Sequence, residues 1–195
     1  FGTARRIDLL SEIVKDLGEF GKNFECHSVD VSDFSSVDEF YRKVSASYDI
    51  VCLINNAGTT SFKRASENSI TEIEEIIKVN LLGAIYSIKS VLPDMMEQKS
   101  GTIINILSVV TKKIFTSSSA YSASKSGLEA YTNVLREEVR DKNIRIINVS
   151  PGATATSIWP EEALQKYSER MMRPEAIAET IYMVYSEKSN LVTED

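Results

Sequence analysis

Two side chains with complementary acid–base chemistry, Tyr121 and Lys125, stand four residues apart in the segment YSASK. On a helix, residues at this spacing share one face. A free tyrosine has a pKa of about 10, which is too high for ready proton exchange at neutral pH. A neighbouring ammonium group stabilises the phenolate and lowers that pKa. The pair therefore suggests an acid–base device, although most such pairs on helices are ordinary surface neighbours.

Composition narrows the class of protein. The chain has 195 residues, of which 43% are apolar and 26% charged, and this is enough for one domain with a substantial core. Its net charge of -6 and its lack of a basic stretch argue against nucleic acid as a partner. No apolar run reaches the roughly 20 residues of a membrane span, and no signal peptide is evident. We therefore expect a cytoplasmic protein without a membrane partner.

Few residues could bind a metal or form a disulfide. Cys26 and Cys52 lie in strand-like runs, where we expect small buried thiols in a reducing compartment. His27 is the only histidine and has no partnering motif, so we interpret it as structural. No cluster has the spacing of metal ligands, and we expect no metal site.

Hydrophobic periodicity predicts strands alternating with helices. Strands are expected at residues 1–4, 24–31, 49–55, 102–107 and 144–149, and helices at 5–17, 34–48, 69–92, 120–140 and from 174 onwards, with an irregular segment before the last helix. Ser69 and Glu72 are spaced as a capping box. This order predicts a doubly wound α/β fold with a single parallel sheet in one domain covering residues 1–195.

Apolar stripes indicate which helix faces should pack inward. The expected stripes are Ile7, Leu10, Val14 and Leu17 in the first helix, Leu128, Tyr131, Leu135 and Val139 in the fourth, and Ile177, Ile181 and Val184 in the last. The conspicuous polar loops, at residues 4–6, 30–31, 55–58, 108 and 151–156, all follow strands. Because parallel strands end at the same edge, these loops should meet at one site.

Six short motifs occur in order along the chain. They are Asp30-Val31, Asn55-Asn56-Ala57-Gly58, Lys78-Val79-Asn80, Ser108 after a strand, Tyr121-x-x-x-Lys125 and Pro151-Gly152-x-x-x-Thr156. In these motifs and their spacing the chain resembles the short-chain dehydrogenase/reductase family, which has a Rossmann fold. Residues 158–160 and 171–178 also resemble, more loosely, the sepiapterin reductase-like and 3-oxoacyl-carrier-protein reductase-like branches.

The resemblance implies a catalytic set of four residues. Tyr121 would protonate a carbonyl oxygen, or accept the proton in the reverse direction, and Lys125 would lower its pKa and hold the nicotinamide ribose. Ser108 would donate a hydrogen bond to the substrate oxygen. Asn80 would bend its helix and hold a water that links Lys125 to solvent. The dinucleotide would supply the hydride.

The resemblance also implies a set of cofactor contacts. Asn56-Ala57-Gly58 would pack beside the adenine ribose and steady the central strand, and the same tripeptide alone would suggest only an ordinary turn. Asp30 would bind the adenine amino group and Val31 would flank the ring; the alternative for Asp30 is a helix cap or turn. Thr156, in the loop that begins with Pro151-Gly152, would bind the nicotinamide carboxamide.

The choice of dinucleotide depends on the segment Gly2-Thr3-Ala4-Arg5-Arg6. It contains no acidic residue to bind the ribose hydroxyls of NAD, and guanidinium groups suit a phosphate. We therefore favour NADP (NADPH) over NAD, with Arg5 as the main contact. Alternatively, both arginines are simply solvated in the first turn of a helix, where cations oppose the helix dipole.

Two features of the family are not found. The glycine-rich turn and first strand that would hold the pyrophosphate are missing, as is the last strand, and we expect the sequence to be part of a longer one. The substrate segment contains Trp159, Tyr167, Met171 and Met172. With Ser108, Trp159 is our candidate substrate contact, and the alternative is that these side chains pack on the last helix.

The function expected from this resemblance is an NADP(H)-dependent oxidoreductase, a carbonyl reductase or alcohol dehydrogenase acting on a small-molecule carbonyl or alcohol. The alternatives are a non-catalytic dinucleotide-binding sensor or scaffold, and an inactive remnant. We also expect a homodimer or homotetramer that pairs the helices at 69–92 and 120–140.

Overall fold

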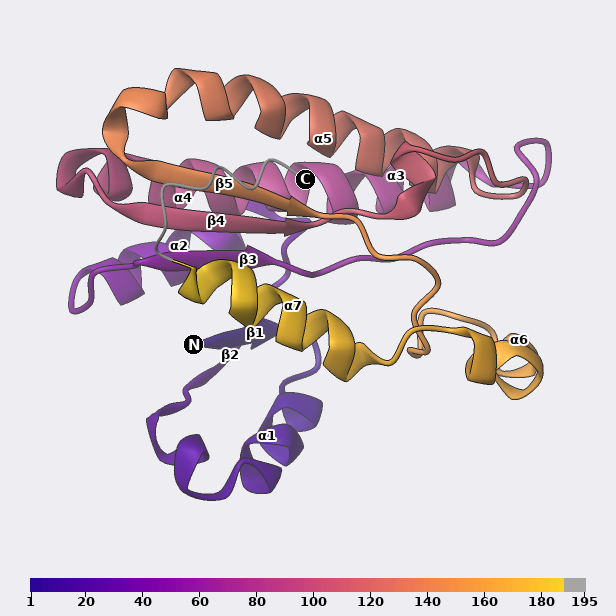
Figure 1. The fold of residues 1–195 in the computed structure, drawn as a ribbon, viewed down its shortest axis with the longest axis horizontal. Coiled ribbons are helices and arrows are strands. Elements are labelled where there is room, and N and C mark those ends of the chain that lie inside the picture. Colours follow the sequence, from indigo (N-terminus) through magenta and orange to yellow (C-terminus); the bar gives the residue numbers. More distant parts are fainter. Residues whose placement is uncertain (188–195) are drawn as a thin grey trace.

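The computed structural model describes residues 1–187 and shows a three-layer α/β arrangement (Figure 1). The strands are β1 (Gly2–Ala4), β2 (Cys26–Ser28), β3 (Cys52–Asn55), β4 (Gly101–Ile106) and β5 (Ile144–Val149). The helices are α1 (Ile7–Asp16), α2 (Phe34–Ser45), α3 (Ile70–Ile77), α4 (Gly83–Gln98), α5 (Ser119–Glu138), α6 (Glu161–Tyr167) and α7 (Pro174–Ser186). Strands and helices alternate up to α5 and β5, as the periodicity predicts.

The strands pair in parallel in two groups. β1 pairs with β2, while β4 lies between β3 and β5. In the second group, Asn55 lies opposite Asn105, which lies opposite Asn148. The described residues contain no backbone pairing between β1 and β3. The arrowheads of β3, β4 and β5 point the same way in Figure 1, so the loops that follow them emerge at one edge.

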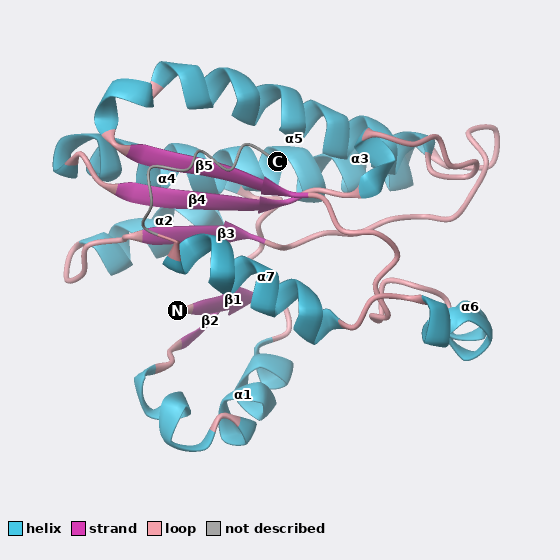
Figure 2. Ribbon diagram, in the orientation of Figure 1, coloured by secondary structure: helices cyan, strands magenta, loops and turns pink. Residues whose placement is uncertain are grey.

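The main core lies between the three-stranded group and the helices α4 and α5. Ile88, Val91 and Met95 on α4 and Ile103 on β4 are inaccessible to solvent. Leu135 and Val139 close the same cluster from α5 and the turn after it. In Figure 2, α4 lies behind the strands and α7 in front of them. Burial of this apolar area is the main force that holds α5, and therefore Tyr121, against the sheet.

The longest helix departs from the sequence prediction. Residues 70–98 form one continuous helical run, with a π-helix over Lys78–Leu82 between α3 and α4, so the end predicted at Leu92 was wrong. Pro93 removes one backbone donor, but Met95 beyond it is fully buried, and this packing favours continued helix. The capping box at Ser69 is present.

By length and composition this helical run could also cross a membrane, contrary to our reading that no apolar run is long enough. However, 44% of its most apolar window is buried inside the fold. A core helix passes the same test, because its apolar face packs on the sheet.

Several smaller expectations were wrong. The stripe predicted for α1 is not buried, since α1 has no buried residue and Ile7 is exposed. The stripe of α7 is only half-buried. Cys26 and Cys52 are half-buried free thiols rather than buried ones. The helix α6 interrupts the segment expected to be irregular. In each case the sequence pattern is local, whereas burial depends on what the tertiary fold places opposite.

Candidate active site

The hydroxyl groups of Ser108 and Tyr121 meet at the edge where β4 ends and α5 begins. Ser108 directly follows Leu107, whose backbone N–H donates to the Val149 carbonyl oxygen at 2.8 Å and so prolongs the β4–β5 pairing. Tyr121 lies in the first turn of α5 and is half-buried. The Ser108 side chain lies close enough to the Tyr121 phenol to lower the pKa of that phenol. The two hydroxyls that the sequence singled out are therefore adjacent.

Lys125 lies one turn further along α5. The residue is buried, with only 4% of its surface exposed. Its Nζ atom donates to the Ile106 carbonyl oxygen at 2.6 Å and lies 5.9 Å from the centre of the Tyr121 ring. No carboxylate pairs with it among the described residues. Burial lowers the pKa of Lys125 to about 8.

The predicted effect of Lys125 on Tyr121 is not found in this geometry. Burial raises the pKa of Tyr121 above its usual value, and the nearby Ser108 side chain offsets part of that rise. The ammonium is bound to a backbone carbonyl rather than to the phenol, so it does not dominate the titration of Tyr121. The net direction at Tyr121 is therefore upward, and the lowering expected from Lys125 stays a prediction.

Asn80 is the centre of the π-helix between α3 and α4 and is almost fully buried. Its side chain accepts a hydrogen bond from the Thr59 N–H and donates to the Thr59 carbonyl oxygen, both at 2.8 Å. The amide also donates to Ser124 Oγ on α5 at 3.0 Å. The helix is distorted at Asn80, as expected, but the side chain also anchors the loop after β3, which the sequence did not reveal.

The turn Asn56-Ala57-Gly58 is exposed and lies next to this anchor. A Cβ atom added at Gly58 would lie 3.5 Å from Asn80 Oδ1 and 3.8 Å from Lys125 Nζ. The turn therefore leads directly to the buried ammonium, and it leaves its backbone open towards solvent. This arrangement leaves room for a ligand to approach main-chain atoms closely.

A row of amide side chains crosses the sheet just before the site. Asn55 donates to Asn105 at 2.9 Å, and Asn105 donates to Asn148 at 3.1 Å. Asn148 in turn exchanges hydrogen bonds with Thr132 on α5. Because these polar groups are paired inside the core, they fix the strand ends and α5 relative to one another. The isolated asparagines within apolar strands were the signal that sequence reasoning overlooked.

Asp30 and Arg5 occupy the ends of β2 and β1. Asp30 Oδ1 accepts from the backbone N–H and the hydroxyl of Ser32, at 2.9 and 2.7 Å. The hydrogen bond from the Ser32 hydroxyl is the main cause of a lowered pKa at Asp30, and Arg5 adds to it. Asp30 therefore has the turn role that was the alternative to binding adenine. Arg5 is exposed, and its Nη1 atom lies 3.9 Å from Glu75 Oε1. Val31 packs against the backbone of Gly83.

The loop after β5 is tied to the Ser108 loop. The backbone N–H of Val109 donates to the Pro151 carbonyl oxygen at 3.0 Å. Further along, Thr156 is half-buried, and Thr154 forms a bridge with Met172. Gly152 is exposed beside Met172. The segment expected to cover the substrate is therefore fastened to the segment expected to hold the nicotinamide.

Trp159 packs on a residue of the loop after β3. Its ring stacks on Phe62, with ring centres 4.7 Å apart, and its Nε1 atom donates to the Thr154 carbonyl oxygen at 3.0 Å. Phe62 belongs to the loop after β3, so the stack joins two loops that lie far apart in the sequence. Sequence reasoning did not identify Phe62, because a single aromatic residue in a polar loop carries no periodic signal.

The described residues contain no group of three or more histidine, cysteine or carboxylate side chains that could hold a metal ion. The chemistry available at this edge is therefore that of two hydroxyls, a buried ammonium and open backbone groups.

A comparison with protein-family models matches residues 1–166 to the short chain dehydrogenase model. The chain belongs to the short-chain dehydrogenase family. A 3-oxoacyl-acyl-carrier-protein reductase of Buchnera aphidicola is 32% identical over 98% of this chain and 81% of its own length. An NADP-dependent 3-hydroxy acid dehydrogenase of Schizosaccharomyces pombe is 30% identical over 98% of this chain and 78% of its own length. The looser resemblance to sepiapterin reductases is not specifically supported.

Solved structures support the same assignment for this short-chain dehydrogenase. An alcohol dehydrogenase from the archaeon Thermococcus sibiricus, complexed with 5-hydroxy-NADP, superimposes with a TM-score of 0.85 at 27% identity. The match covers 98% of this chain and 81% of that one. The expected doubly wound α/β fold is thus confirmed, and the protein is an oxidoreductase with NADP-bound structural neighbours.

Proposed function

We propose that this short-chain dehydrogenase reduces a small-molecule carbonyl with NADPH, or oxidises the corresponding alcohol with NADP. The observation that carries the proposal is the close approach of the Ser108 side chain to the Tyr121 phenol, one helical turn from the buried ammonium of Lys125. Two adjacent hydroxyls can bind one carbonyl oxygen. A non-catalytic dinucleotide sensor, our alternative, has no need of such a pair.

The residues present fit a dinucleotide. Lys125 has three N–H donors, and the only hydrogen bond described for them goes to Ile106. The Asn56-Ala57-Gly58 turn lies nearby, because a Cβ atom added at Gly58 would lie 3.8 Å from Lys125 Nζ. Ribose hydroxyls are suitable acceptors for such an ammonium. Asp30 and Val31 would contact the adenine, and Thr156 in the loop after Pro151-Gly152 the carboxamide.

The chain's own residues then handle the proton. When bound, NADPH supplies the hydride. Ser108 donates a hydrogen bond to the carbonyl oxygen, where negative charge develops in the transition state. Tyr121 gives that oxygen its proton. Lys125, when it turns from Ile106 towards the ribose, adds a positive charge near the phenol and reduces the cost of leaving a phenolate. Asn80 would hold the water that returns the proton from solvent.

We further propose that NADP is preferred over NAD. Arg5 is exposed at the end of β1, where its guanidinium lies 3.9 Å from Glu75 and acts electrostatically on Asp30. Its guanidinium is therefore available to a phosphate. The NADP-dependent relative of S. pombe and the NADP analogue bound by the T. sibiricus enzyme support this choice.

Replacing Tyr121 by phenylalanine tests the proposal. With NADPH and a panel of ketones and aldehydes, Tyr121→Phe should lower kcat by about a thousandfold, because the general acid is lost. Binding of NADPH, measured by fluorescence, should persist. Tyr131→Phe is the matched control, since it removes a hydroxyl from the same helix outside the site and should leave kcat unchanged. Reduction that survives in Tyr121→Phe would exclude this mechanism and favour the sensor.

The oligomeric state, the cellular location and the partners are also proposals. We propose a cytoplasmic homodimer or homotetramer that pairs α5 and the helical run at 70–98, with neither a membrane nor nucleic acid as a partner. Val134 on α5 and Ile70 at the start of α3 are largely exposed apolar side chains, consistent with a covered surface. Light scattering on the intact enzyme that gave only a monomer would refute the assembly.

A further inference from the structure

A cavity of about 520 Å³ lies beside the first turn of α5. Its walls come from the loop after β3, through Arg64, and from the segment between β4 and α5, through Val110, Lys113, Ile114 and Phe115. This volume falls in the range of sites for small organic molecules.

The cavity adjoins the two hydroxyls of the candidate active site. Ser122, which lines the cavity, directly follows Tyr121. Val110, which also lines it, donates its backbone N–H to Ser108 Oγ at 3.4 Å. Ser108 and Tyr121 do not themselves form the cavity wall. A ligand whose carbonyl reaches the hydroxyls would therefore extend the rest of its structure into the cavity.

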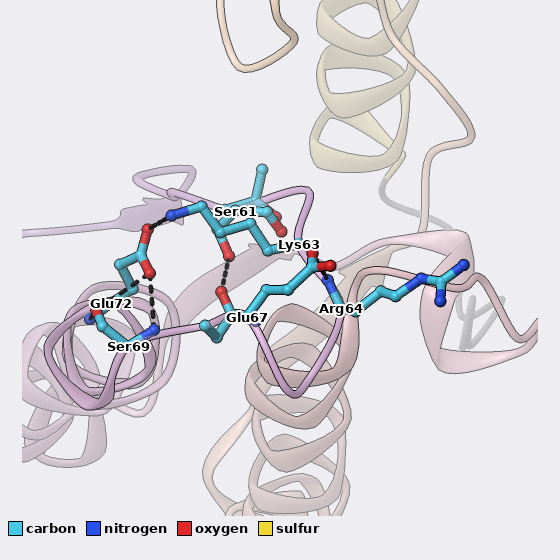
Figure 3. Close-up of polar contacts among 8 residues, drawn as sticks. Ser61, Lys63, Arg64, Glu67, Ser69 and Glu72 are labelled. Atoms are coloured by element: carbon cyan, nitrogen blue, oxygen red, sulfur yellow. Dashed lines mark hydrogen bonds and ion pairs between the residues drawn. The ribbon is translucent and has the colours of Figure 1, made fainter.

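The charged residues on the wall are both cationic. Arg64 and Lys113 line the cavity, and no carboxylate does. Within residues 1–187, neither side chain has an ion pair or a hydrogen bond. Their chain neighbours differ, because Lys63 pairs with Glu72 and Lys112 with Glu129. In Figure 3, Lys63 reaches Glu72 at the start of α3, while the Arg64 side chain extends away from that cluster.

The backbone of Arg64 is held in place. Its carbonyl oxygen accepts from the backbone N–H groups of Glu67 and Asn68, at 2.9 and 3.2 Å. Its own N–H donates to a carboxylate oxygen of Glu67 at 3.1 Å (Figure 3). The nearby carboxylate thus binds the backbone, and the guanidinium stays free. A cation presented on a fixed turn loses little freedom when it binds an anion.

The rest of the wall combines apolar side chains with hydroxyl groups, which belong to Thr116, Ser117, Ser119 and Ser122. Ile114 is 99% exposed and Phe115 is 48% exposed, although both are large hydrophobic residues. A ligand that suits this surface carries an apolar chain together with an anionic group. Arginine binds carboxylates through paired hydrogen bonds, and the lysine adds a second positive charge.

We propose that Arg64 and Lys113 bind the carboxylate of an oxo acid and so set the substrate class as small oxo acids and their hydroxy acids. This inference rests on the proposed reductase function. In the reaction, the hydride of NADPH adds to the carbonyl carbon and the proton of Tyr121 to its oxygen, giving a hydroxy acid and NADP. The carboxylate stays unchanged and serves only to orient the substrate.

The test compares 3-oxohexanoate with its neutral amide, 3-oxohexanamide, in the intact enzyme with NADPH. Arg64→Gln and Lys113→Gln should each lower kcat/KM for the acid about tenfold, mainly through KM, and leave the amide nearly unchanged. Lys63→Gln and Lys112→Gln are the matched controls. Each removes one positive charge from a paired neighbour, and neither should alter the ratio of acid to amide.

A second readout separates this inference from the reductase proposal. Calorimetry would measure binding of hexanoate, which cannot be reduced, and Arg64→Gln should weaken it about tenfold. Equal losses for acid and amide, or equal losses in the Lys63→Gln control, would overturn the carboxylate site and leave the reductase standing. Weakened hexanoate binding in an enzyme that reduces no carbonyl would support the anion site and refute the reductase.

Discussion

Lys125 carries the least favourably placed charge in the described part of the chain. Its ammonium is nearly fully buried, with one backbone carbonyl as its hydrogen-bond partner and no counter-charge. Such a group costs stability in the free protein, because water solvates an ammonium far better than one carbonyl does. We expect a residue kept at this cost to serve binding or catalysis.

The variant Lys125→Met should therefore stabilise the protein that has no bound dinucleotide. The folded pKa of about 8 lies below the ordinary value of 10.5, so the unfolded chain binds more protons between these two values. The penalty is full below pH 8 and declines as pH rises towards 10.5. At pH 7 we expect a gain of about 2 kcal/mol in the free energy of unfolding, after the lost hydrogen bond to Ile106 is allowed for.

Urea unfolding at pH 7 and pH 10 would measure this gain, which should be smaller at pH 10. Lys89→Met replaces an exposed lysine and should change stability little. A Lys125→Met protein that is less stable at pH 7 would show that the ammonium is better compensated than its burial indicates.

Arg5 and Arg6 offer a matched pair of residues for the cofactor preference. Arg5→Gln should reduce the ratio of kcat/KM for NADPH over NADH by about tenfold, since one arginine–phosphate contact is lost. Arg6→Gln removes the same charge from the next position and should leave the ratio unchanged. Steady-state kinetics with both dinucleotides would decide, and an equal effect of the two variants would indicate general electrostatic attraction instead.

At the scale of elements, α4 lies against the turn that follows β2. A Cβ atom added at Gly83 would lie 2.9 Å from the Val31 carbonyl oxygen and 3.0 Å from the Val31 side chain. The first distance is shorter than real contacts allow, and a backbone atom cannot move aside without moving the turn. Gly83 thus permits the close packing that fixes Asp30-Val31 in place.

We therefore expect Gly83→Ala to raise the KM for NADPH several-fold and to lower the free energy of unfolding by about 1–3 kcal/mol. Gly127→Ala is the control, because its added Cβ would meet the end of the Leu81 side chain at 3.1 Å, which can rotate away. Kinetics and urea unfolding of both variants measure the difference. If Gly83→Ala left the KM for NADPH unchanged, the turn would not contribute to dinucleotide binding.

At the scale of the whole molecule, stability is unevenly distributed. The strand β4 is hydrogen-bonded on both sides and contains four consecutive buried residues. Helix α1 has no buried residue, and it accompanies the short β1–β2 pair. Regions with few buried contacts open most easily. The molecule thus combines a rigid sheet under the candidate catalytic residues with a weaker part that carries Arg5.

Hydrogen exchange measured by mass spectrometry should reproduce this order. We expect the amides of β4 and β5 to exchange slowest and those of α1 fastest, and NADPH should slow exchange around β1 and α1 if Arg5 binds the phosphate. Equal protection of α1 and β4 without a ligand would contradict the distribution of buried residues.

The sequence alone determined the order of elements and supplied the candidate site residues. The spacing of apolar residues reflects the helical and extended periods, so it predicted α5 and β5 closely. The placement of polar loops after strands predicted that the loops at 55–58, 108 and 151–156 would emerge at one edge, because parallel strands end there. Both inferences depend on the local spacing of residues and on the order of elements along the chain, and both can be read directly from a sequence.

Only the tertiary structure decided what depends on distance and burial. It showed that Lys125 binds the Ile106 carbonyl oxygen and that burial raises the pKa of Tyr121. It also joined Asn55, Asn105 and Asn148 in one row and, within residues 1–187, left the Arg64 side chain unpaired beside a cavity. Desolvation and pairing depend on groups brought together from distant parts of the chain, and no spacing along the sequence reports them.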